Sequence, residues 1–96
     1  MKHTNQIKGF NGSKLELAER IGDLYYDSLS ELLALLSEKI KEDSEADLGR
    51  GRRNLANHLQ ECASSLDIAS KEIESAWGIC SPYVDEWLKN NGKTRE

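Results

Sequence analysis

The chain has 96 residues, of which 31% are charged and 38% are hydrophobic. A chain of this length supplies one small core at most. No stretch approaches the roughly 18 uninterrupted apolar residues that a transmembrane helix requires, and the N-terminus lacks the apolar segment of a signal peptide. We therefore expect a single cytoplasmic domain with no membrane partner.

The net charge of −4 is unevenly distributed. Residues 1–14 carry three lysines and no acidic residue, whereas residues 15–47 carry ten acidic residues against three basic ones. The basic patch at Arg50, Arg52 and Arg53 is short. Proteins that bind duplex DNA present a wide basic face, so no nucleic-acid partner is expected.

The apolar residues favour helices over strands. The chain contains thirteen Leu and seven Ala but only one Val. Leu and Ala lose little side-chain freedom in a helix, whereas strands are enriched in β-branched residues. The composition predicts an all-α fold.

The first predicted elements are a polar N-terminal arm over residues 1–12 and a long helix over residues 13–43. Ser13 and Glu16 form a capping box, in which each side chain can satisfy a free amide of the first turn. Apolar residues then recur at alternating steps of three and four. We interpret Gly22, inside this predicted helix, as a point of close approach to another helix.

A turn follows in the sequence EDSEADLGRGRR, and a second helix is predicted over residues 48–80. Its apolar residues recur at alternating spacings of four and three residues without interruption, which is typical of a left-handed supercoiled seam. We expect Leu66, in the middle of this seam, to be fully buried. The predicted seam is Leu55, Leu59, Cys62, Leu66, Ala69, Ile73, Ala76 and Cys80.

Pro82 interrupts the pattern because proline lacks the amide that an inner helical turn needs. We expect a short third helix over residues 82–90, with Ser81 as its N-cap, and a tail over residues 91–96. The alternative is one helix that kinks near residues 78–82.

The aromatic residues are expected to gather at one end of the molecule. A turn near residue 46 places Trp77 beside Leu15 and brings Tyr83 and Trp87 near Phe10. We therefore predict that Phe10 packs on Tyr83 and Trp87 and fixes the N-terminal arm.

Two helices are too few to cover the apolar residues. Four leucines lie within residues 32–36, and they cannot all face one neighbouring helix. The sequence therefore predicts a long antiparallel two-helix hairpin that dimerises into a four-helix bundle. The alternative is a monomer closed by the third helix and the arm.

Four acidic residues spaced four apart form a predicted ridge on the first helix. Such a ridge is either a solvated face or an interaction surface for a basic partner protein. The ridge consists of Glu19, Asp23, Asp27 and Glu31.

The arginine run at the turn is a candidate anion or phosphate site. Arg50, Arg52 and Arg53 combine guanidinium groups with the amides and positive dipole of a helix N-terminus. The alternative is that these arginines pair with nearby acids, which are Glu42, Asp43, Glu45 and Asp47.

Catalytic patterns are missing from the sequence. It contains no G-x-S-x-G nucleophile turn, no phosphate-binding GxxxxGK[ST] loop and no Glu-x-x-His metal motif. We expect no enzyme activity, no metal and no cofactor. The predicted function is a homodimeric protein-interaction or regulatory adaptor module; the alternative is an anion- or phosphate-binding accessory protein that uses the arginine turn.

Overall fold

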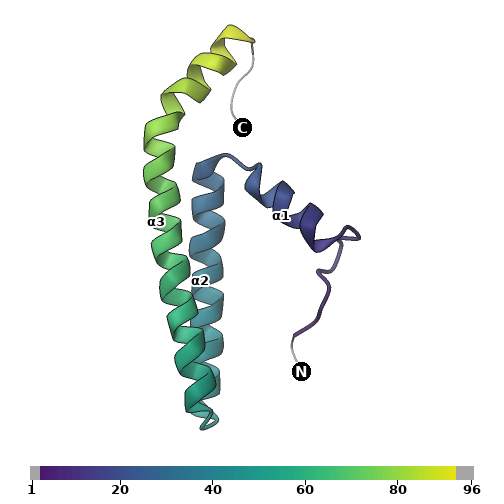
Figure 1. The fold of residues 1–96 in the computed structure, drawn as a ribbon, viewed down its shortest axis with the longest axis vertical. Coiled ribbons are helices and arrows are strands. Elements are labelled where there is room, and N and C mark those ends of the chain that lie inside the picture. Colours follow the sequence, from purple (N-terminus) through teal and green to yellow (C-terminus); the bar gives the residue numbers. More distant parts are fainter. Residues whose placement is uncertain (1–2, 93–96) are drawn as a thin grey trace.

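The computed structural model describes residues 3–92, and this part of the chain contains three α-helices and no strand (Figure 1). The helices are α1 (Lys14–Gly22), α2 (Tyr26–Gly49) and α3 (Arg53–Asn90). α2 and α3 lie side by side and antiparallel, and α1 projects from the start of α2 on the side away from α3 (Figure 1). The all-α prediction is confirmed. The last residues of the predicted tail, 93–96, lie outside the described part.

The predicted helix over residues 13–43 is wrong, because it is divided into α1 and α2. Its start is as expected: Ser13 accepts a hydrogen bond from the Glu16 amide at 3.1 Å. Gly22 and Asp23 are weak helix formers and end α1, and Tyr25 then adopts an extended conformation. A methyl group added at Gly22 would meet no atom within 4 Å, so this glycine does not permit a close helix approach.

The turn between α2 and α3 lies further along the chain than predicted. α2 continues to Gly49, and the chain reverses through Gly51, whose φ of +80° suits glycine. The Asp47 carbonyl accepts hydrogen bonds from the amides of Arg50 and Arg52. This later turn shifts the pairing of the helices. Trp77 consequently packs against Tyr25, with ring centres 5.9 Å apart, and the predicted Leu15 neighbour is wrong.

α3 continues through Pro82 to Asn90, so the predicted end at residue 80 and the separate helix over 82–90 are wrong. Pro82 cannot donate to the carbonyl of Gly78, and its ring crowds the same carbonyl. The missing hydrogen bond affects one turn only, and α3 remains a single helix whose C-terminal part is bent (Figure 1). The long-helix alternative is closer to the structure.

Small residues form the contact line between α2 and α3. The serine hydroxyls donate to carbonyl oxygens of the facing helix: Ser37 to Ala63 and Ser44 to Ala56, both at 2.6 Å. Such bonds require the two backbones to approach closely, which large side chains would prevent. We call this contact line the small-residue seam, and it consists of Ser30, Ser37, Ser44, Ala56, Ala63 and Ser70.

The predicted α3 seam is therefore displaced by one residue at every second position. Ala56 and Ala63 are buried, whereas their neighbours Leu55 and Cys62 are exposed. Leu66 is half-buried in the single chain, so its expected full burial is not observed there. Periodicity identified the apolar side of α3, but the short serine and alanine side chains determine the actual contact line.

Phe10 does not reach the aromatic residues of α3, and the predicted cap is wrong. Its ring folds back over Gly12, where an added Cβ would lie 2.7 Å from a ring atom. The Arg20 guanidinium lies 5.7 Å from the ring centre, in a cation–π geometry. Because α1 ends at Gly22 and turns away from α3, the arm is carried away from Tyr83 and Trp87.

Candidate interaction surface

One side of the α2–α3 pair carries two neighbouring rows of apolar residues. We call these rows the apolar face. No member is buried, and Leu36 and Leu55 are 43% and 45% exposed. Its members are Leu29, Leu33, Leu36 and Ile40 of α2 and Leu55, Leu59, Cys62, Leu66, Ala69, Ile73, Ala76 and Cys80 of α3.

A pocket at the turn end brings the lines of the two rows together on one side of the pair. The α2 row steps by four and three, and the next positions in this rhythm are Asp43 and Asp47. These two residues line a 470 Å³ pocket together with Leu55, the first member of the α3 row. The two rows therefore meet at the turn end. Further along, Leu36 and Cys62 directly precede the facing residues Ser37 and Ala63, which places them on the same side of the antiparallel pair.

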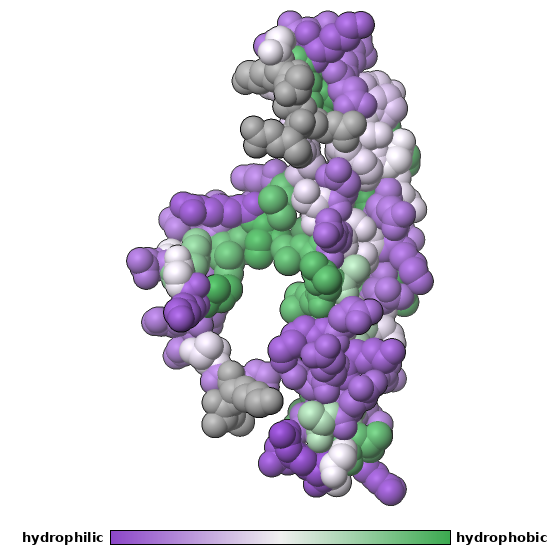
Figure 2. Space-filling view, turned by 180° about the vertical axis from the view of Figure 1, so that it is seen from behind, coloured by the Kyte–Doolittle hydropathy of each residue, from purple (hydrophilic) through white to green (hydrophobic). Residues whose placement is uncertain are grey.

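The opposite side of the pair is acidic. Asp27 and Glu31 of α2 and Glu74 of α3 line a shallow 420 Å³ pocket. Seen from behind, hydrophilic side chains cover most of the α2–α3 pair, and a hydrophobic band extends from α1 to the adjoining part of the pair (Figure 2). The pair thus separates an apolar face from an acidic one.

The chain exposes more surface than a compact protein of its size. Its accessible surface is 7955 Å², whereas a compact monomer of this mass exposes about 5,500 Å². Its radius of gyration is 17.1 Å against about 12.5 Å for a globular chain of this length. Among the described residues, no large side chain is fully buried. The apolar face is consequently open in the single chain.

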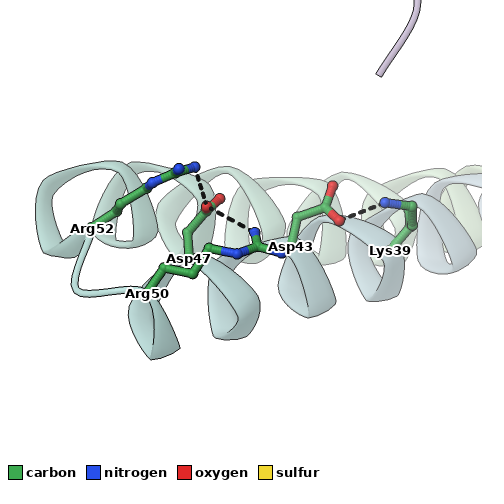
Figure 3. A network of polar contacts seen from close by, with 5 residues as sticks. All are labelled: Lys39, Asp43, Asp47, Arg50 and Arg52. Atoms are coloured by element: carbon green, nitrogen blue, oxygen red, sulfur yellow. Dashed lines mark hydrogen bonds and ion pairs between the residues drawn. The ribbon is translucent and has the colours of Figure 1, made fainter. Parts of the chain in front are cut away.

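A charged cluster closes the turn end of the apolar face (Figure 3). Asp47 is only 9% exposed, and its Oδ1 lies 3.5 Å from Arg50 and 3.3 Å from Arg52. Lys39 pairs with Asp43 one turn earlier on α2. Two of the three candidate anion-binding arginines, Arg50 and Arg52, therefore form ion pairs with Asp47 of their own chain. The third, Arg53, is exposed. These contacts favour the intramolecular interpretation of the arginine run, and the anion site stays a prediction.

The predicted acidic ridge is not continuous. Glu19 lies on α1 and Asp23 at its C-terminal end, whereas Asp27 and Glu31 belong to α2. All four residues are exposed, and the Asp27 carboxylate accepts a hydrogen bond from the Ser28 amide at 2.7 Å. The break at residues 23–25 separates the two halves. The second half contributes to the acidic side of the pair, where Glu74 joins it; sequence spacing within one helix could not reveal that residue.

Comparisons with family models, with characterised proteins and with solved structures find no match to this chain. Within residues 3–92, none of the helices has the length and hydrophobicity that a membrane span requires. The structure thus defines an all-α protein in which a close helix pair carries an open apolar face.

Proposed function

We propose that this protein is a non-enzymatic homodimeric interaction module, in which two copies join their apolar faces into a four-helix bundle. The open apolar face is the observation that carries this proposal. Its rows have the repeat of 3.5 residues that keeps apolar positions facing a partner helix along a supercoil. The small-residue seam within the chain consists of other residues, and no member of the two rows is buried by it.

The exposed area is large enough for a stable dimer. The single chain exposes about 2,400 Å² more than a compact monomer of its mass. A standard interface covers about 800 Å² on each partner, and obligate dimers cover more. Among residues 3–92, the buried hydrophobic residues are Ala56, Ala63 and Leu88, which form little core to offset the conformational entropy of folding. Covering the apolar face supplies the missing burial.

The distribution of charge supports a second copy as the occupant. The acidic side of the pair faces away from the apolar face, so two copies approach without bringing these acids together. The acids that do lie at the turn end, Asp43 and Asp47, are paired with basic residues of the same chain. In the bundle the acidic side remains exposed and available to another protein, as an adaptor role requires.

Sedimentation equilibrium tests the dimer. We expect a mass about twice the 10.8 kDa of the chain at micromolar concentration. Leu36→Glu places a charge on the apolar face and should give a monomer or an unfolded chain. Leu35→Glu is the matched control, because Leu35 is adjacent and 60% exposed but lies off the apolar face; it should remain dimeric. A monomeric wild-type protein would refute the proposal.

Anion binding at the arginine turn is the alternative proposal. It is supported by the N-terminus of α3, where the N-cap residue Arg52 makes no side-chain capping hydrogen bond, and by the exposed Arg53. A phosphate titration followed by thermal melting tests it. Binding at this turn predicts a rise in melting temperature that disappears in Arg50→Ala/Arg53→Ala; an equal rise in both proteins would contradict it.

A further inference from the structure

α3 extends well beyond the start of α2. Ser30 faces Ser70, so Tyr26, the first residue of α2, lies opposite the region near residue 74. Residues 75–90 therefore form an overhanging end about 24 Å long that α2 does not cover (Figure 1). One side of this overhang presents Ile79, Tyr83 and Trp87 at steps of four, and they are 74%, 70% and 54% exposed.

α1 is a second amphipathic segment without a neighbouring helix to cover it. It contains no buried residue, and the extensive helix–helix contact of the molecule is between α2 and α3. Leu17 and Ile21 lie on one side of α1, four residues apart, and Leu24 follows in the link to α2. In Figure 2 this part of the chain continues the hydrophobic band that crosses to the pair.

The charges beside these two surfaces are complementary. Lys14 and Arg20 are exposed and border the apolar side of α1, because they lie three residues from Leu17 in either direction. Glu86 of the overhang and Glu72, just before it, are exposed and lie seven residues after and before Ile79, on the same side of α3. A basic border on one surface and an acidic border on the other favour their contact.

The two surfaces lie at the same end of the molecule, but α1 leaves α2 on the side away from α3 (Figure 1). In a bundle of two copies, α2 has its own α3 on one side and a helix of the second copy on another. We propose that α1 of each copy packs against the α3 overhang of the other copy, so that exchanged arms close the dimer. This inference rests on the proposed homodimer and assigns it a second contact.

Photocrosslinking tests the arm exchange directly. Tyr83 is replaced by a benzophenone analogue of phenylalanine, and this full-length chain is mixed with an excess of heavy-isotope-labelled wild-type chain. After irradiation, we expect a covalent product that joins the probe to a heavy peptide from α1. A probe attached to α1 of its own chain, or to any other region of the heavy chain, would refute arm exchange.

Sedimentation separates this failure from failure of the dimer itself. A dimer without the α1 crosslink leaves the proposed function intact and refutes only the exchange, whereas a monomer refutes both. Ile21→Glu should weaken dimerisation by about tenfold or more, since it places a charge in the proposed contact. Leu15→Glu is the control: Leu15 is 70% exposed on the other side of α1, and its substitution should leave the dimer unchanged. Equal effects of both substitutions would contradict the contact.

Discussion

The middle of the α2–α3 pair and the end that carries α1 and the α3 overhang use their side chains in opposite ways. In the middle, short serine and alanine side chains are buried, and hydroxyl groups bridge to the facing backbone at 2.6 to 2.9 Å. At the other end, large apolar side chains such as Ile79 and Tyr83 are mostly exposed. Large apolar side chains are thus left exposed at the end of α3 that α2 does not cover.

This contrast separates two kinds of contact. The small-residue seam is complete within one chain, because both partners of every hydrogen bond are present. The apolar face and the overhang are incomplete, because burial of their side chains requires surface that the chain does not supply. Substitutions in the seam should therefore act on the fold of each copy, and substitutions on the apolar face should act on association.

The largest effect is expected for Leu66→Ala. In a dimer that covers the apolar face, loss of this buried side chain should lower the free energy of unfolding by about 2–5 kcal/mol. Ile68→Ala, at a position 64% exposed and off the face, should change it by less than about 0.5 kcal/mol. Denaturant unfolding at fixed protein concentration measures both. A cost for Leu66→Ala as small as that of Ile68→Ala would show that the face is uncovered in solution.

Ala63→Leu tests the small-residue seam. Ala63 is 3% exposed, and its carbonyl accepts the Ser37 hydroxyl, so a larger side chain must push the helices apart. We expect a loss of about 1–3 kcal/mol in the free energy of unfolding. Ala46→Leu, at an exposed position of α2, is the control and should be nearly neutral. A neutral Ala63→Leu would contradict the close approach of the two helices.

Asp47→Ala should have a smaller effect, about 1 kcal/mol, because the ion pairs join a mostly buried carboxylate to exposed arginines. Asp67→Ala removes an exposed ion pair with Lys71 and should cost almost nothing. Thermal unfolding compares the two variants. Equal melting temperatures would show that the cluster at the turn contributes no more than an ordinary surface pair.

Gly22→Ala should stabilise the protein slightly, by up to about 1 kcal/mol, since Gly22 is helical and a methyl group there meets no atom within 4 Å. Circular dichroism should show equal or greater helix content. Gly51→Ala should have the opposite sign, because Gly51 has a φ of +80°. Destabilisation by Gly22→Ala would indicate that the end of α1 needs glycine for a reason other than helix propensity.

The sequence by itself determined the fold class and the start of α1. Thirteen leucines and seven alanines with a single valine favour helices everywhere, and the Ser13 cap depends only on residues within one turn. The repeat in α3 also identified its apolar side, because periodicity reports which residues share a face. These properties are local, so neighbouring residues are sufficient to specify them.

The tertiary structure decided the break at residues 23–25, the passage of α3 through Pro82 and the line along which the helices meet. Gly22 inside an apolar pattern is compatible with a kink, a close approach or a helix end, and the surroundings select among them. The contact line follows Ala56 and Ala63 instead of Leu55 and Cys62, because hydrogen bonds from Ser37 and Ser44 require facing carbonyls at short range. Which side of an amphipathic helix contacts its neighbour depends on the shape of both helices, and the pattern of one helix cannot specify it.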